Sequence, residues 1–147
     1  MIEAEAGDLP KARKLFRRTL EVNPRARHTY SAWAKMEKQF GSREAARKLL
    51  ETGVKLNRTD AVLLQALGVL ESEDGNLKLA RSYFRKSARV NPRHMAAWQA
   101  WAIMEDKADN AEGARELFQR ALWCEPQVRV RVIRVRHVDR GTWPMMS

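Results

Sequence analysis

Apolar residues recur among polar ones at helical spacing in two kinds of segment along the chain. In the first kind, Trp33 and Glu37 follow Tyr30 at steps of three and four residues. In the second kind, apolar residues four positions apart form a stripe: Ala12, Phe16 and Leu20. Residues three or four apart lie on one face of an α-helix. Each segment is therefore predicted to be a helix with one buried face.

The two segments recur with a period of 34 residues and without insertions. The period is clearest in an Ala-Arg dipeptide at 12–13, 46–47, 80–81 and 114–115. A single helical hairpin of this length cannot bury its own apolar face, so neighbouring hairpins must stack. We predict an all-α fold, a right-handed α-α superhelix of 34-residue hairpins over residues 1–126. Its expected units are a partial repeat at 1–24 and full repeats at 25–58, 59–92 and 93–126.

Further columns of matched residues support this period. Small residues in the first helix, which allow close helix packing, are Ala34, Gly68 and Ala102. Apolar columns of the second helix are Phe16, Leu50, Phe84 and Phe118, and Leu20, Val54, Ala88 and Leu122. A turn column holds Gly7, Gly41, Gly75 and Asp109. Asp8 and Ser42 are predicted N-caps of second helices, with Pro10 in the first turn.

The two ends of the chain depart from the repeat. Ile2 and Glu3 match the end of a first helix, so we expect either a piece of a longer array or an internal Met taken as the start. Residues 127–147 are predicted to be an irregular basic tail, because Val and Arg alternate with period two from Val128. A degraded repeat is the alternative, since Val135 and Asp139 fall in repeat columns. No apolar run is long enough to span a membrane, and no targeting segment can be recognised.

The net charge of +10 is concentrated on the second helices and the turns that follow them. Residues 76–93 contain six basic side chains and no acidic one, whereas 59–75 contains four acidic side chains. Such a basic stripe favours a polyanion such as RNA. The alternative is an ordinary solvated outer face. Expected phosphate contacts are Arg17, Arg18, Arg25, Arg85, Lys86 and Arg93.

The first helix of each repeat carries a Glu ten residues before the Arg of the next Ala-Arg pair. We predict structural ion pairs within each repeat, which would staple its two helices together. The predicted pairs are Glu37 with Arg47, Glu71 with Arg81, and Glu105 with Arg115. Carboxylates used in this way are not acid/base catalysts.

Other side chains with chemical potential have structural interpretations. The tryptophans, Trp33, Trp98 and Trp101, are expected to pack in the core instead of stacking on bases. The histidines, His28, His94 and His137, share no column and have no companions at metal-ligand spacing. Cys124 is expected to be a small, partly buried apolar residue. We therefore expect no catalytic residue, cofactor or metal.

Partner contacts are expected on the first helices, away from their packing stripe, because these helices line the concave face in superhelices of this kind. A polar column there comprises Ser31, Gln65 and Gln99, with Lys35 and Lys38 alongside. Amide side chains of this kind can bind base edges or a peptide backbone. The acidic first helix of the 59–92 repeat argues against a groove lined by RNA throughout.

Paired aromatics, a Glu three or four residues later and a following Ala-Arg resemble half-a-TPR (HAT) repeats, relatives of the tetratricopeptide repeat (TPR). The resemblance rests on Trp98, Trp101, Glu105 and Arg115 and covers about residues 1–126. It is most similar to the chloroplast type that matures messenger RNA. The second repeat departs from the pattern, with Leu64 and Leu67 in place of aromatics and Gly53 interrupting its second helix, so looser packing is expected there.

The resemblance implies a role in RNA processing or mRNA stabilisation, in the nucleus or a chloroplast, with RNA and proteins of an RNP complex as partners. The leading hypothesis is thus a non-catalytic RNA-binding or RNP-scaffolding array. The alternative is a protein-interaction scaffold that binds a partner peptide or helix without RNA. An enzyme with a small-molecule substrate is a distant third, since no phosphate loop or nucleophile motif is present.

Overall fold

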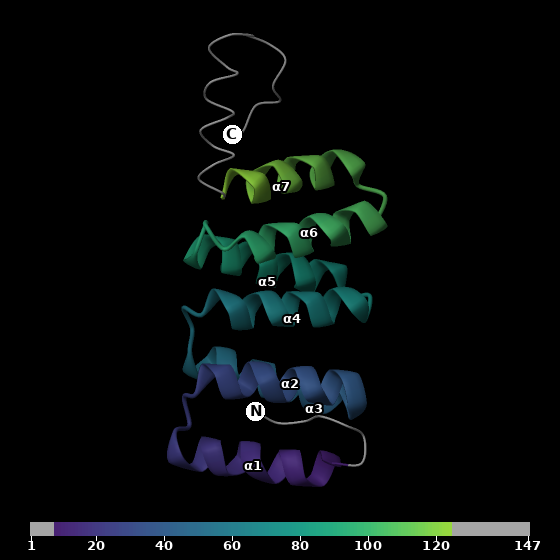
Figure 1. Cartoon of the computed structure of the whole chain (residues 1–147). Helices are drawn as coiled ribbons and strands as arrows, with labels where there is room; N and C mark the ends of the chain where they lie inside the picture. The colour runs from purple at the N-terminus through teal and green to yellow at the C-terminus, as the bar shows by residue number, and fades with distance from the viewer. Residues whose placement is uncertain (1–7, 125–147) are drawn as a thin grey trace.

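The chain folds as a stack of antiparallel helices. The structure is a computed structural model that describes residues 8–124. The helices are α1 (Leu9–Val22), α2 (Arg27–Phe40), α3 (Arg43–Leu56), α4 (Ala61–Glu73), α5 (Leu77–Val90), α6 (Met95–Lys107) and α7 (Ala111–Trp123). They lie one above another along the array (Figure 1). This confirms the predicted all-α repeat architecture. The expectations for residues 1–7 and for the 127–147 tail lie outside the described residues.

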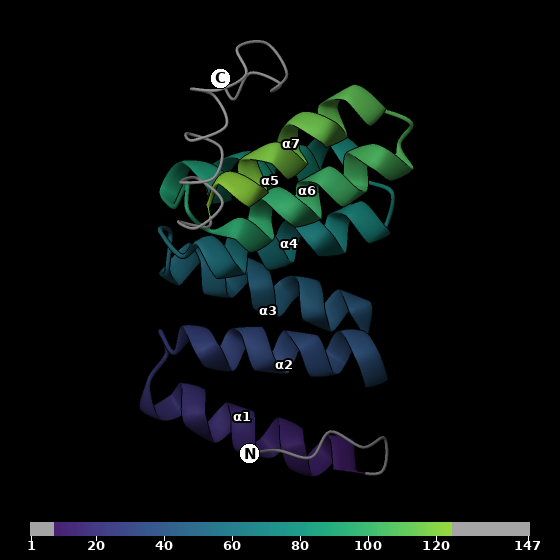
Figure 2. The same cartoon turned by 45° about the horizontal axis from the view of Figure 1, so that its top comes forward.

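Three helical hairpins, α2–α3, α4–α5 and α6–α7, form the repeats, and α1 is the second helix of a preceding partial repeat. The first helices of successive repeats, α2, α4 and α6, contact one another in order. Each second helix also packs on the first helix of the next repeat, as α1 does on α2. Turning the molecule shows α5 lying behind α6 and α7 (Figure 2). None of the helices between residues 8 and 124 is long and apolar enough to cross a bilayer.

The small-residue column forms the centre of the stack. Ala12, Ala46, Ala80 and Ala114 are all at most 3% exposed. This agrees with the expectation that matched positions line up along the array. Gly68 has the tightest packing of the facing column, because a Cβ at this position would lie 2.7 Å from Phe84 Cε1.

Aromatic side chains join one repeat to the next. Phe16 stacks on Trp33 of the following repeat with ring centroids 5.6 Å apart, and Phe84 stacks on Trp101 at 6.4 Å. Such contacts add to the area that the rings bury. In the described chain no further helix follows α7, and Phe118 in the same column is 40% exposed.

The middle repeat is not loosely packed, contrary to expectation. Leu64 and Leu67 are at most 3% exposed, and Leu67 belongs to the largest apolar cluster of the described chain. Gly53 allows this packing, since a Cβ there would lie 3.0 Å from Tyr30 Cβ and 3.2 Å from Leu63 Cδ1.

Helix capping follows the sequence only in part. Ser42 accepts a hydrogen bond from the Ala45 amide, as predicted for an N-cap. Asp8 occupies the N-cap position of α1 but makes no side-chain capping bond, so this prediction is wrong. Asp60 is a cap that the sequence analysis missed, and its Oδ1 accepts from the amides of Val62 and Leu63.

Candidate interaction surfaces

Ion pairs join neighbouring repeats, not the two helices of one repeat. Arg13 Nε and Nη2 donate to both Glu37 carboxylate oxygens at 2.7 and 2.9 Å. Arg81 binds Glu105 in the same bidentate way at 2.9 and 2.8 Å. In the middle interface Arg47 Nε lies 3.1 Å from Glu71 Oε1. The partners are 24 residues apart in each case, which is ten residues less than the 34-residue period.

The predicted pairs Glu37–Arg47, Glu71–Arg81 and Glu105–Arg115 are therefore wrong. Glu37 lies near the end of its helix, where the turn amide of Ser42 also donates to it at 3.3 Å. The preceding second helix reaches this spot, whereas the second helix of the same repeat directs its arginine to the repeat that follows. Arg115 is exposed and has no ion pair within residues 8–124. Its partner at the 24-residue spacing would be Asp139, outside the described residues.

Two of the buried glutamates, Glu37 and Glu105, are held ionised. The Arg13 guanidinium lowers the pKa of Glu37 from 4.5 to about 2, with the Trp33 indole N–H and the Ser42 amide adding to the effect. Arg81 likewise lowers the pKa of Glu105. The indoles of Trp33 and Trp101 donate to these carboxylates at 3.0 and 3.1 Å. These groups are structural acceptors instead of acid/base catalysts.

Within the described residues the turn column comprises Gly41, Gly75 and Asp109, and two different causes account for it. A Cβ at Gly41 would overlap the Glu37 carboxylate and lie 3.0 Å from Arg13 Nη2. Gly75 and Asp109 instead adopt positive φ, at 86° and 61°. Glycine reaches that region without strain.

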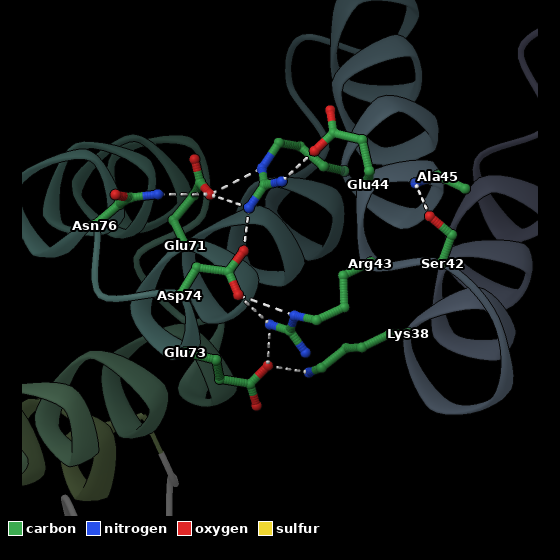
Figure 3. Close-up of polar contacts among 10 residues, drawn as sticks. Lys38, Ser42, Arg43, Glu44, Ala45, Glu71, Glu73, Asp74 and Asn76 are labelled. Carbon is green, nitrogen blue, oxygen red and sulfur yellow. Dashed lines mark hydrogen bonds and ion pairs between the residues drawn. The ribbon is translucent and has the colours of Figure 1, made fainter.

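The middle interface carries an enlarged network. Arg47 also pairs with Asp74 and with Glu44, and Arg43 lies 2.7 Å from Asp74 Oδ1. Glu73 completes it, 2.7 Å from Lys38 Nζ. Figure 3 shows this chain of contacts between α2 and α3 on one side and the end of α4 on the other. Here Leu67 supplies no indole donor, and Glu71 accepts from Arg47 and from the Asn76 side-chain amide instead.

The five predicted partner contacts lie on the first helices, as expected, but differ in availability. Lys35 and Gln99 are exposed, whereas Ser31 and Gln65 are half-buried. Lys38 is engaged by Glu73. The sequence analysis missed two apolar residues, Val62 and Ile103, which are 48% and 47% exposed on α4 and α6. Val62 matches His28 and Ala96 in the other repeats, and Ile103 matches Val69 and Lys35, so neither stood in a wholly apolar column.

A groove of about 440 Å³ lies where the first helices begin. Its lining includes Arg27, His28, Ser31, Val62 and His94. The sequence placed His28 and His94 in unrelated columns, yet stacking brings both to this groove. Burial lowers the pKa of His94, and its Nε2 atom is buried without a hydrogen-bond partner. No group of side chains within residues 8–124 could hold a metal ion.

The six predicted phosphate contacts are all exposed, but they do not form one continuous stripe. They lie on α1, α5 and the turns after them, and α3 separates these two helices. The matching positions of α3 and its turn carry Glu51, Thr52 and Thr59. Lys86 also lies over the Tyr83 ring at 5.7 Å. The six predicted positions therefore skip α3, whose exposed basic residues, with its turn, are Lys48, Lys55 and Arg58.

The polar atoms of Tyr30 and Trp98, in the first aromatic column, have a structural role. Tyr30 Oη donates to the Pro24 carbonyl and Trp98 Nε1 to the Pro92 carbonyl, both at 2.8 Å. Leu64, which has no donor, follows Arg58 where the other repeats have proline. Cys124 is half-buried, and its Sγ lies 3.3 Å from the Arg120 carbonyl oxygen.

Comparisons with known proteins give the fold. No family model matches the chain, and no curated protein is significantly similar to it. Among solved structures it resembles MamA 41-end from Desulfovibrio magneticus RS-1, with a TM-score of 0.68 at 21% identity over 82% of this chain and 68% of that chain. A second MamA crystal structure gives a TM-score of 0.67 at 19% identity over 87% and 68%. The chain has the fold of TPR-like helical repeat arrays.

Proposed function

We propose that this protein is a non-catalytic protein-interaction module whose partner binds across the exposed face of the first helices α2, α4 and α6. The partner segment would be an extended peptide or a helix, which are the usual shapes accepted by helical grooves. The observation that carries this proposal is the pair of exposed apolar side chains, Val62 and Ile103, on two adjacent first helices. Apolar side chains exposed close to polar ones are typical of binding surfaces.

The polar residues around this pair fit a peptide. Gln65 and Gln99 can donate to and accept from a peptide backbone. Lys35 supplies positive charge toward the α2 end of the face, whereas Arg27 lies 3.6 Å from Asp60 and Glu73 is paired with Lys38 and Arg43. A partner with apolar residues at its centre and acidic residues at the α2 end would match this arrangement.

RNA binding within an RNP complex, which the HAT resemblance implies, is the second candidate. The observation in its favour is the set of six exposed basic side chains on α1, α5 and their turns. We rank it lower because α3 interrupts that set with Glu51 and because Lys38 on the first-helix face is neutralised.

Nuclease treatment distinguishes the two candidates, because only a partner bound through protein contacts remains bound once RNA is digested. The whole chain is used as bait in a cell extract, with wild type compared with Val62→Asp/Ile103→Asp. The control is Leu15→Asp/Leu79→Asp, which changes two equally exposed apolar residues on second helices. We expect proteins that remain bound after nuclease treatment, that the control retains and that the Val62/Ile103 variant loses.

The opposite outcome would assign the function differently. If every captured protein is lost after nuclease treatment, the association runs through RNA. Titration of the purified chain with poly-uridine RNA would then show binding that weakens steeply with salt. If captured proteins depend equally on Leu15 and Leu79, the first-helix face is not the binding surface.

A further inference from the structure

A second groove, of about 530 Å³, lies between the second helices α5 and α7, with α6 as its floor. Ala88, Trp98 and Trp101 form its base. Arg85 and Arg89 line the α5 wall, and Glu116 and Arg120 line the α7 wall. This groove uses a different face of α6 from the one that carries Gln99 and Ile103.

The groove is open because one column residue is small. The matching positions of the earlier repeats hold Leu20 and Val54, which pack against the central apolar cluster. Ala88 occupies the same column with a single methyl group, so space remains above it. The two tryptophans below are half-buried instead of fully covered.

The walls of this groove carry an excess of positive charge. Within residues 8–124 no carboxylate pairs with Arg85 or Arg89. Of the two acidic residues that line the groove, Glu105 is bound to Arg81 and Glu116 lies 3.5 Å from Arg120. A ligand with negative charge spaced along its length would therefore be attracted to the α5 wall.

We propose that this groove binds an acidic, extended segment of a partner protein. Carboxylates of the segment would pair with Arg85 and Arg89, and an apolar side chain would fill the space above Ala88 beside Trp98. Arginine–carboxylate pairs are strong because the guanidinium can donate two parallel hydrogen bonds. The apolar side chain supplies the hydrophobic part of the binding free energy.

The aromatic contacts favour a protein segment over single-stranded RNA. A nucleotide base would need an open indole face on which to stack. Trp101 is already stacked with both Phe84 and Trp98, at centroid distances of 6.4 and 6.1 Å. The Arg120 guanidinium lies over the Trp98 ring at 5.3 Å. An apolar side chain can contact the ring edges without displacing any of these groups.

Charge also argues against the protein's own C-terminal segment as the occupant. Residues 127–147 contain five arginines and one aspartate. A segment with this composition would be repelled by the α5 wall. This segment is therefore a poor occupant, and the proposed occupant is an acidic segment of another chain.

The first test uses a fluorescein-labelled peptide of alternating Glu and Leu, with a Lys-Leu peptide as the charge control. Binding is measured by fluorescence anisotropy at low salt. Arg85→Glu/Arg89→Glu is expected to weaken binding of the Glu-Leu peptide about tenfold or more. The matched control is Arg17→Glu/Arg18→Glu, which makes the same charge change on the exposed surface of α1. It should bind like wild type.

The second test fills the groove without changing its charge. Ala88→Leu introduces the residue that stands at Leu20 in the same column, and we expect it to weaken the Glu-Leu peptide at least tenfold. Ala88→Val, which matches Val54, gives a smaller loss. If Ala88→Leu unfolds, the Val variant and the Arg85/Arg89 pair decide.

Any of four results would overturn the proposal. They are no binding of the Glu-Leu peptide, equal binding of the Lys-Leu peptide, equal loss in the α1 control, and normal binding by folded variants of Ala88. Poly-uridine RNA that competes with the peptide and requires Arg85 and Arg89 would also overturn it, because the groove would then be a nucleic-acid site.

Discussion

The ion pair between Arg13 and Glu37 gives a prediction with a definite pH dependence. Glu37→Gln keeps the shape of the side chain but removes its charge. The Gln side chain can accept through only one oxygen, whereas Glu37 accepts from Arg13, Trp33 and the Ser42 amide. The Gln amide nitrogen would then face at least one of these donors, so a buried donor is left unpaired. We expect the variant to be less stable at neutral pH.

The size of the loss can be estimated from the pKa of Glu37. Its folded value of about 2 is below its ordinary value of 4.5. A difference of about 2.5 corresponds to about 3 kcal/mol. Arg13 is 33% exposed, and solvent screening of its charge reduces the expected loss to about 2 kcal/mol.

The sign of the pH dependence follows from the same comparison. Because the pKa is depressed in the folded state, the carboxylate stabilises the fold fully above pH 4.5. This stabilisation is lost as the pH falls from 4.5 toward 2. The stability difference between wild type and Glu37→Gln should therefore be largest at pH 7 and become smaller by pH 3.

The assay is urea unfolding followed by far-UV circular dichroism at both pH values. Glu21→Gln, an exposed residue of α1 with no ion pair among the described residues, serves as the control and should change stability by less than about 0.5 kcal/mol. If Glu37→Gln loses no more stability than Glu21→Gln, or loses as much at pH 3 as at pH 7, the carboxylate does not hold the two repeats together.

Three further substitutions test two contacts between helices and one helix cap, each by the midpoint of urea unfolding. Gly68→Ala should cost about 1 to 2 kcal/mol, because overpacking against Phe84 outweighs the gain in helix propensity; a stabilised variant would contradict this close contact. Asp60→Ala should cost about 1 kcal/mol through loss of the α4 cap, and an unchanged midpoint would show that Asp60 does not cap. Ser87→Ala should cost about 1 kcal/mol, since Ser87 Oγ donates to the buried Ala61 carbonyl at 2.7 Å; Ser82→Ala on the same helix is the comparison that should change little.

Much of the fold could be predicted from the period alone. The recurrence of Ala12 and Ala46 at matched positions predicted a buried column, and the structure has one. Helix capping was less predictable: Ser42 caps as expected, whereas Asp8 does not. A capping bond depends on the local backbone and on competing contacts, which residue identity does not determine.

The sequence predicted some exposed residues of the first helices, but not which residues come together to form a groove. The exposed polar column of the first helices was found from spacing. The groove above Ala88 was not, because its volume depends on which larger residues its neighbours place around one small side chain. Exposed Val62 and Ile103 also gave no periodic signal.

The sequence by itself determined the period, the helices and the residue types that must meet at each position of the stack. It could not determine which copy of a position meets which. In an exact repeat, Glu37 is related by the same register to the arginine ten residues later and to the one 24 residues earlier, so both pairings satisfy the pattern. In the tertiary structure Glu37 pairs with Arg13, because each second helix packs against the first helix of the next repeat and its arginine reaches the glutamate there.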